Sequence, residues 1–456
     1  MPFSTHLDRH QSRYVAELME FIAIPSVSAD PTHQGDMVRA ADWVAARLTA
    51  AGLEHARVIP TKGHPVVLAD WLHAGADKPT VLIYGHFDVQ PPEPLEAWTS
   101  PPFAPEVRGG RIYGRGASDD KGGLMTPILA CEALLAQGPL PVNVKFFVEG
   151  EEEIGSPSIP DAVQSLAPEL AADMIFSADG LQWRPDQPQI LEALKGIVKL
   201  ELVVRGPRAD QHSGLYGGGI ANPAMALAQI LASMKATDGT ITVAGFYDDV
   251  IHLTDEDRAA IARIPYDEAA WLAETGAPAT AGEPGYTTRE RLWARPTLDV
   301  NGLTSGWQGA GSKTVLPAEA RAKITCRLVA AQTPEGVAAR LTEHLCAHTP
   351  PGVTAELQVI PGGSDPLLIP RGHNAAALAE TILAEVYGKT PYRTRVGGSI
   401  PILSTFRDVL GLHTVVLGFS HDDENLHAPD EFFRLEAFRK GQEVYGRLLQ
   451  RLGGQA

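Results

Sequence analysis

A short apolar run that stops at a glycine and is followed at once by histidine and aspartate constrains the fold of this chain more than any other stretch. Residues 81–89 read Val-Leu-Ile-Tyr-Gly-His-Phe-Asp-Val, which predicts a buried strand ending at Gly85. Open α/β sheets bind their ligands beyond the carboxyl ends of parallel strands. His86 and Asp88 would then lie at a ligand site, and the alternative is a solvated loop that contains them by chance.

Further acidic residues and a second histidine also follow strand-like runs. They are Asp119, the run Glu151-Glu152-Glu153, Asp179 and, near the C-terminus, His427. Each has an ordinary alternative: Asp119 could cap the next helix, three consecutive glutamates are commonly solvated, and Asp179 precedes a glycine as in many turns. Their conjunction favours a metal site, because imidazole and carboxylate ligands without thiolate suit Zn²⁺, Mn²⁺ or Co²⁺. A carboxylate between two histidines could bridge two ions and generate a hydroxide near neutral pH.

The order of the predicted elements indicates an α/β fold with an insertion. Strands and helices alternate over residues 1–194 and again over 366–456, which predicts one catalytic domain with a mostly parallel central sheet flanked by helices. Residues 195–365 contain long alternating strands and two helices, which predicts an inserted α+β domain with one solvated sheet face. The polar, proline-containing segment 248–295 receives no assignment.

Composition excludes several classes of partner. The net charge is −17, and no cluster of Lys or Arg offers a basic face, so we expect no nucleic-acid partner. No run approaches the ~20 apolar residues of a membrane span, and the first 13 residues lack a signal-peptide core, so we expect no membrane partner. The three cysteines, Cys131, Cys326 and Cys346, are widely spaced and odd in number, which favours reduced thiols and a cytoplasmic location.

Six motifs occur in an order that resembles the M20 metallopeptidases, most closely the dipeptidase branch related to carnosine dipeptidase. The resemblance covers essentially the whole chain. The motifs are Gly85-His86-Phe87-Asp88-Val89-Gln90-Pro91, Tyr113-Gly114-Arg115-Gly116-Ala117-Ser118-Asp119-Asp120-Lys121-Gly122, Glu149-Gly150-Glu151-Glu152-Glu153-Ile154-Gly155-Ser156, Asp210-Gln211-His212-Ser213-Gly214, Gly397-Gly398-Ser399-Ile400-Pro401 and Asn425-Leu426-His427-Ala428-Pro429-Asp430-Glu431.

The resemblance implies a centre with two divalent metal ions. His86 and Asp179 would hold one ion, Glu153 and His427 the other, and Asp119 would bridge the two. Zinc is the first expectation, with manganese or cobalt as alternatives. The nucleophile implied is a hydroxide that bridges the metals.

The same resemblance assigns roles to residues around the metals. Glu152 would be the general base that shuttles a proton from water to the leaving amine, and Asp88 would orient the His86 imidazole. His212, in the inserted domain, would reach the active site of a partner subunit and stabilise the oxyanion, which implies a homodimer formed through the inserted lid domain. Arg327 and Ser399 would bind the terminal carboxylate of the substrate.

Three positions depart from the motifs expected for this branch. Val396 stands where a glutamate is expected to recognise the free amino group of the substrate, and Asp430 stands where asparagine is common. His421 lies close enough in sequence to His427 to be an alternative ligand. The resemblance also implies a cis peptide bond between Asp119 and Asp120.

These inferences predict a metallopeptidase that hydrolyses dipeptides or similar small peptides with a free C-terminal carboxylate. The alternative within the superfamily is an amidohydrolase of N-acyl or N-carbamoyl amino acids. A non-catalytic binding protein is a second alternative, against which the intact set of site residues argues. Nucleophilic catalysis by Ser213 or a cysteine is disfavoured, because no Gly-x-Ser-x-Gly elbow is present. The sequence leaves open the preferred side chains of the substrate.

Overall fold

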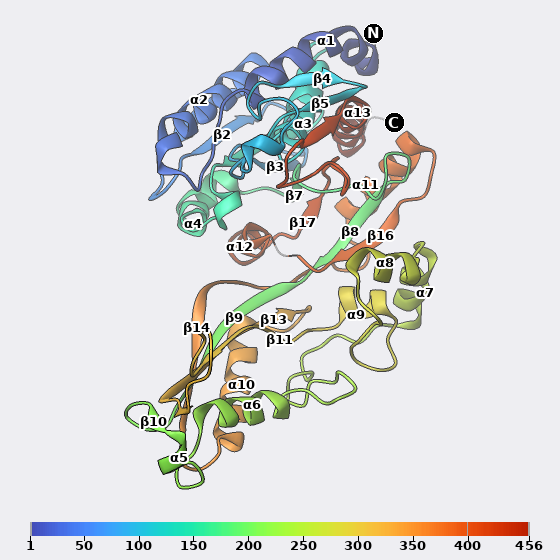
Figure 1. The fold of residues 1–456 in the computed structure, drawn as a ribbon. Helices are drawn as coiled ribbons and strands as arrows, with labels where there is room; N and C mark the ends of the chain where they lie inside the picture. The colour runs from blue at the N-terminus through green and yellow to red at the C-terminus, as the bar shows by residue number, and fades with distance from the viewer. Residues whose placement is uncertain (1, 399, 455–456) are drawn as a thin grey trace. The chain divides into compact units, whose positions relative to one another are not determined.

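The structure is a computed structural model that describes residues 2–398 and 400–454 (Figure 1). The chain divides into two compact units. Unit 1 comprises Met1–Leu191, Ile369–Arg393 and Ile402–Ala456, and unit 2 comprises Glu192–Leu368 and Thr394–Pro401.

A six-stranded sheet of order β1-β2-β6-β3-β7-β17 forms the centre of unit 1. Its strands β6, β3, β7 and β17 are parallel to one another, and β2 and β1 add an antiparallel edge. The mixed α/β class with a mostly parallel sheet is thus confirmed. The strands are β1 (Glu54–Ile59), β2 (Val66–Trp71), β3 (Thr80–His86), β6 (Asn143–Glu149), β7 (Met174–Ser177) and β17 (Thr414–Val416).

Helices cover this sheet and explain why its central strands are continuous apolar runs. Residues 81–86 of β3 are all buried, as expected for a parallel strand with helices on both faces. Helix α3 is buried almost all round and contacts α1 and α13, so it is the central helix of the core. The helices are α1 (Phe3–Ile22), α2 (Gln34–Ala50), α3 (Lys121–Leu135), α4 (Ile159–Leu170), α11 (Asn374–Tyr387), α12 (Pro401–Leu410) and α13 (Leu435–Leu452), with short 3₁₀ turns η1 (Pro31–His33), η2 (Leu95–Ala97) and η3 (Glu152–Ile154).

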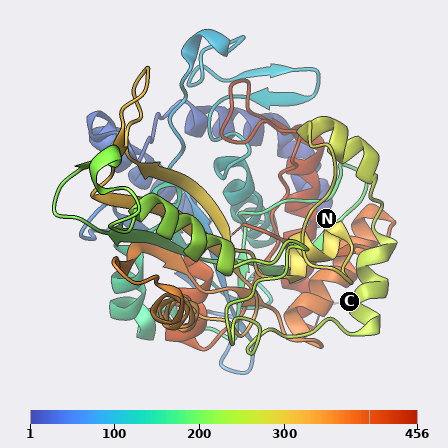
Figure 2. The same ribbon diagram turned by 60° about the horizontal axis from the view of Figure 1, so that its bottom comes forward.

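A second, three-stranded sheet of unit 1 brings two distant loops together. Strand β5 (Arg111–Tyr113) pairs with β4 (Glu106–Arg108) on one side and with β18 (Phe432–Arg434) on the other. The loop from β5 to α3 therefore lies beside the loop before β18, as Figure 2 shows for the cyan hairpin and the red loop. Asp119 belongs to the first loop and His427 to the second. Sequence analysis did not predict this sheet, because its strands are only three residues long.

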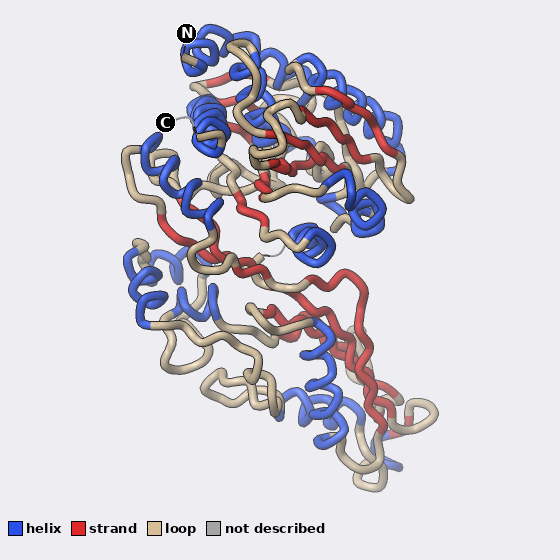
Figure 3. Tube along the Cα trace, turned by 180° about the vertical axis from the view of Figure 1, so that it is seen from behind, coloured by secondary structure: helices blue, strands red, loops and turns tan. Residues whose placement is uncertain are grey.

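Unit 2 is built on an antiparallel sheet of order β11-β13-β9-β14. Figure 3 shows it from behind as long red tubes. Helices α6 and α10 pack against its strands, and burial alternates along β9, so the prediction of an α+β domain with one solvated sheet face is confirmed. The elements are β9 (Gly196–Arg205), β11 (Asp299–Ser305), β13 (Glu319–Leu328), β14 (Thr354–Ser364), α6 (Pro223–Ser233) and α10 (Pro334–His348).

The segment that received no assignment folds into three short helices. Thr254 and Thr287 form capping boxes with Asp257 and Glu290, and these local signals start two of the helices. The helices are α7 (Asp255–Arg263), α8 (Glu268–Thr275) and α9 (Thr288–Ala294), and the remaining small elements are β8 (Gln189–Leu194), β10 (Gln211–His212), α5 (Ser213–Tyr216), β12 (Val315–Leu316), β15 (Leu367–Leu368) and β16 (Tyr392–Val396). Among the described residues, we find no helix with the length and apolarity needed to cross a membrane.

Candidate metal centre

The parallel register of unit 1 places chemically active side chains at one edge of the central sheet. His86 ends β3 and lies opposite Glu149, the last residue of β6, while Tyr84 lies opposite Ser177, the last residue of β7. The chain then leaves β6 through η3 and leaves β7 toward Asp179. The strand ends therefore deliver a histidine and several carboxylates to the same place, as the sequence predicts.

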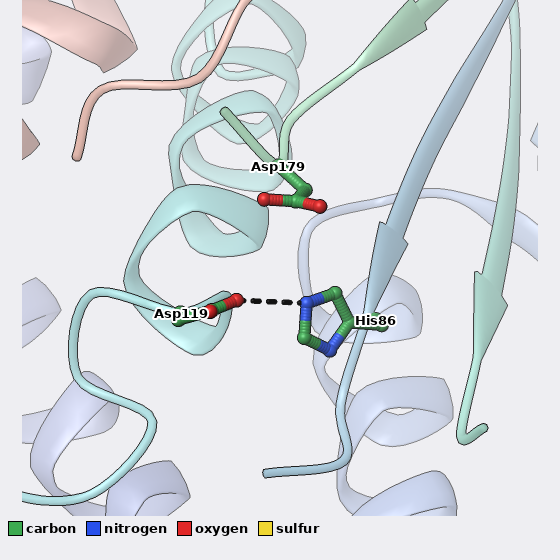
Figure 4. A group of neighbouring side chains, drawn as sticks. All are labelled: His86, Asp119 and Asp179. Carbon is green, nitrogen blue, oxygen red and sulfur yellow. Dashed lines mark hydrogen bonds and ion pairs between the residues drawn. The ribbon is translucent and has the colours of Figure 1, made fainter. Parts of the chain in front are cut away.

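The five predicted metal ligands form two groups that share Asp119. His86, Asp119 and Asp179 make one group, and Asp119, Glu153 and His427 make the other, with ligand atoms within 4.8 Å of one another in each. In Figure 4 the three side chains of the first group point toward one another from β3, from the loop before α3 and from the loop after β7. The peptide between Asp119 and Asp120 is cis, as expected.

Each carboxylate oxygen of Asp119 faces a different histidine. His86 Nε2 lies 3.0 Å from Oδ1, and His427 Nε2 lies 3.0 Å from Oδ2. His427 Nε2 is also 3.2 Å from Glu153 Oε2, to which Gln90 donates at 2.8 Å. This arrangement is suited to a carboxylate that bridges two ions.

The electrostatics of the group fit divalent cations. Burial, followed by repulsion from Asp119, raises the pKa of Asp179 to about 7 and raises the pKa of Glu153. Hydrogen bonds with Asp119 and Glu153 raise the pKa of His427 to about 10. The carboxylates of the two groups thus carry more negative charge than two imidazoles can compensate. Every potential ligand atom is a carboxylate oxygen or an imidazole nitrogen, and zinc, manganese and cobalt accept both.

Glu152 lies beside both groups in η3. Burial raises the pKa of its carboxyl group well above the usual range, and the neighbouring carboxylates of Asp179 and Asp119 also raise it, whereas His86 lowers it. A carboxyl group with this pKa holds its proton until a cation nearby favours the ionised form.

Asp88 organises the turn that carries the two glutamates. Its buried carboxylate accepts the backbone N–H of Glu152 at 3.2 Å and that of Glu153 at 3.0 Å. His86 Nδ1 lies 3.1 Å from the Asp88 carbonyl oxygen and 3.4 Å from its carboxylate. Asp88 therefore contacts the imidazole that it was predicted to orient, and it also fixes the backbone of the glutamate pair.

Glu431 belongs to the last of the six motifs, but the sequence predicted no role for it. Glu431 Oε1 accepts hydrogen bonds from the backbone N–H groups of Ser118 (2.9 Å) and Asp119 (3.1 Å). Glu431 Oε2 accepts one from the backbone N–H of Gly116 (2.9 Å) and one from the guanidinium group of Arg115 (2.8 Å). Both Glu431 and Arg115 are buried. One carboxylate thus holds the whole loop that presents Asp119.

His421, the alternative ligand, belongs to neither group of ligand atoms. It is buried, its backbone N–H donates to Glu424 Oε2 at 3.0 Å, and its Nδ1 lies 3.2 Å from Glu424 Oε1. Glu424 also accepts the Ser118 hydroxyl at 2.5 Å. His421 therefore has a place in the network that supports the Asp119 loop.

Two of the predicted substrate contacts, Arg327 and His212, belong to unit 2. Arg327 lies on β13, where its carbonyl oxygen accepts the N–H of Thr297. His212 is exposed, and its Nδ1 accepts the N–H of Gly214 at 3.0 Å. Ser399 lies outside the described residues.

Asp430, a departure from the expected motif, accepts two hydrogen bonds from Thr99, at 2.8 and 2.7 Å.

Comparison with known proteins supplies independent information. The profile of the family described as Peptidase family M20/M25/M40 matches residues 82–451. The Cys-Gly metallodipeptidase of Schizosaccharomyces pombe is 31% identical over 96% of this chain and 95% of its own, and the Beta-Ala-His dipeptidase of Rattus norvegicus is 29% identical over 96% and 93%. The M20 family metallo-carboxypeptidase Sso-CP2 from Sulfolobus solfataricus has a similar structure, with a TM-score of 0.80, 32% identity and coverage of 96% of this chain and 99% of that one.

Proposed function

Because the chain belongs to peptidase family M20, a family of hydrolases that act on peptide bonds, we propose that it is a dinuclear metallopeptidase that cleaves dipeptides or similarly small peptides with a free C-terminal carboxylate. Family membership agrees with the resemblance inferred from the six motifs. The observation that carries the proposal is the pair of ligand groups joined by Asp119, with Glu152 beside them.

In the proposed centre, His86 and Asp179 would hold one ion and Glu153 and His427 the other, with Asp119 common to both groups of ligands. Zinc is the first expectation, and manganese and cobalt suit the same ligands. Bound ions would polarise the scissile carbonyl and make water acidic enough to react near neutral pH.

Glu152 carries the proton in the proposed reaction. Its carboxylate takes a proton from water as the water oxygen bonds to the carbonyl carbon, and it returns that proton to the nitrogen as the C–N bond breaks. Asp88 keeps Glu152 in position through the backbone N–H that it accepts. Arg327 is proposed to pair with the substrate carboxylate through its planar guanidinium, together with Ser399.

We also propose a homodimer formed through unit 2, in which His212 of one subunit completes the site of the other. Mixing two inactive variants tests this idea. If His212→Ala and Glu152→Ala subunits are unfolded and refolded together, one site in each mixed dimer has an intact Glu152 and an intact His212 of the partner, so activity should return. Absence of recovery in verified mixed dimers, or normal kcat in the His212→Ala enzyme, would refute it.

We also propose that the protein is located in the cytoplasm. All three cysteines are free, and Cys346 is exposed, which agrees with a reducing cytoplasm.

The deciding experiment is a substrate panel assayed with chelated enzyme reloaded separately with Zn²⁺, Mn²⁺ or Co²⁺. Free dipeptides, N-acetyl dipeptides and N-acetyl amino acids should be compared at equal concentration. Metal-dependent cleavage of dipeptides supports the proposal, and cleavage of N-acetyl dipeptides as well would indicate carboxypeptidase action, in line with the name of the Sulfolobus relative. Cleavage of N-acetyl amino acids alone would select the amidohydrolase alternative, which the named relatives do not favour.

A further inference from the structure

Unit 2 contains a cavity of about 710 Å³ that is lined by Lys195, at the start of β9, and by residues of the segment 235–299. Its volume is typical of a site for a small molecule. The charged and aromatic side chains of the lining comprise four basic, two aromatic and three acidic residues. The basic and aromatic ones are Lys195, Lys235, Arg291, Arg295, Tyr247 and Trp271, and the acidic ones are Asp238, Glu283 and Asp299.

The charges around this cavity do not balance. Four basic residues face three acidic ones, which leaves one positive charge in excess. Glu283 pairs with Arg295 through two contacts of 2.8 Å, Asp299 lies 3.8 Å from Lys235, and Asp238 accepts the backbone N–H of Thr240 at 2.9 Å. Lys195 and Arg291 have no carboxylate at ion-pairing distance within residues 2–398 and 400–454. The Lys195 ammonium donates to the Arg291 carbonyl oxygen at 3.1 Å, and the Arg291 guanidinium donates to the Gly282 carbonyl and the Thr288 hydroxyl.

Several buried donors in this cavity also lack acceptors. Lys195 is only 3% exposed, and its ammonium group has three N–H donors, of which one is accounted for within the described residues. Arg291 Nε and Arg295 Nη1 are buried without a hydrogen-bond partner in the described part of the chain, and the Arg295 side chain is 5% exposed. Buried cationic groups without acceptors are unfavourable, and an anion in the adjoining cavity would offset the positive charge that they bury.

We propose that this cavity, the Lys195 cavity, binds a small organic anion. The anionic group, a carboxylate or a phosphate monoester, contacts Lys195 and Arg291, and the apolar body of the ligand packs against Trp271 and Leu292. The inference does not depend on the proposed peptidase reaction, because it rests on unit 2 alone.

The protonation of Lys195 agrees with this assignment. Burial, together with the positive charges of Arg327 and Arg295, lowers the pKa of Lys195 to about 8, and Asp299 raises it only in part. A bound anion restores the preference for the charged ammonium and so binds more tightly to the protonated form.

Isothermal titration calorimetry of the full, metal-loaded chain at pH 7 tests the inference with benzoate, phenyl phosphate and neutral benzamide. At least one anion should bind the wild type, and benzamide should not bind. Lys195→Met and Arg291→Gln should each weaken binding about tenfold or more, the loss expected for one charge-assisted hydrogen bond. Preference for benzoate would identify a carboxylate site, and preference for phenyl phosphate a phosphate site.

Two control variants separate this cavity from other positive charges. Lys199→Met removes an exposed lysine of the same strand, β9, and Arg327→Met removes the proposed contact for the substrate carboxylate; both should retain anion binding. Unfolding midpoints of all variants establish that each is folded. Anion binding that survives both Lys195→Met and Arg291→Gln, or that is no tighter than binding of benzamide, would overturn the proposal.

Discussion

Unit 1 and unit 2 each bury an excess of charge, but of opposite sign. In unit 1, carboxylates at the ends of parallel strands outnumber the imidazoles among them, whereas in unit 2 Lys195 and Arg291 have no acidic partner among the described residues. The first excess is built on a rigid sheet edge and the second on short helices and loops. An excess of buried charge in either setting favours a ligand of the opposite sign, which is the basis for proposing cations in unit 1 and an anion in unit 2.

The largest expected effect concerns the proton carrier of unit 1. Glu152→Gln should lower kcat by about 10²- to 10⁴-fold, the usual contribution of a general base, because an amide cannot accept the proton. Metal content, measured by atomic absorption, should stay the same, since Glu152 is not among the ligand groups. Glu96→Gln, at an exposed position, serves as the control. Unchanged kcat in Glu152→Gln would show that the charge at this position is not catalytic.

The next effect concerns stability and the loop that carries Asp119. Glu431→Ala should lower the free energy of unfolding by about 3–5 kcal/mol, because it leaves the Arg115 guanidinium buried without its partner. Urea unfolding measures the change. Glu436→Ala, which breaks an exposed pair with Lys440, should cost less than about 1 kcal/mol. Equal losses in the two variants would contradict the role given to Glu431.

Removal of the cations should leave the buried carboxylates of unit 1 without compensating charge and so destabilise the folded chain. Chelation should lower the free energy of unfolding by about 2.7 kcal/mol for each ion site, relative to enzyme with metal at 100 times its Kd. Asp179→Asn, which removes one ligand carboxylate, should reduce this difference. Thermal or urea unfolding with and without chelator gives the comparison, and a stability unaffected by saturating metal would show that the carboxylates are balanced in some other way.

The smallest effect concerns the positive excess of unit 2 and depends on pH. The pKa of Lys195 is about 8 in the folded chain and 10.5 for an ordinary lysine, so between these values the unfolded chain binds more protons and stability rises with pH. The lowered pKa destabilises the folded chain at pH 7, and about 2–3 kcal/mol of this cost is relieved by pH 10. Lys195→Met should therefore flatten the stability profile between pH 7 and 10. Urea unfolding across this range, with Lys199→Met as control, checks the prediction, which fails if both variants keep the wild-type slope.

Much of unit 1 could be predicted because parallel strands have a strong and local signature. A continuous apolar run that ends in glycine identifies β3, and the shared edge of parallel strands brings His86 and Asp179 together without further information. Asp119 and His427 are different. Their positions depend on β5 and β18, strands of three residues. The pattern of strand-like runs included both residues among the candidate ligands, but only the family resemblance assigned the bridging role to Asp119 and an ion to His427.

Other features escaped prediction because they arise from contacts between distant segments. The role of Glu431 depends on four hydrogen bonds to residues 115–119, more than 300 positions earlier in the chain. The Lys195 cavity depends on how the segment 235–299 folds, and only the capping boxes at Thr254 and Thr287 gave a local indication of its helices. Strand ends can be predicted well from the sequence, whereas the loops that enclose a cavity are difficult to predict from it.

The bonds of Glu431 have a consequence for the order in which the protein matures. The ribosome makes the segment that contains Asp119 long before it makes His427 and Glu431, which lie more than 300 residues later in the chain. Until those residues emerge, the Asp119 loop lacks its clamp and the second ligand group lacks its histidine. A chain released before these residues are made would therefore lack both the Glu431 clamp and one ligand of the proposed metal centre.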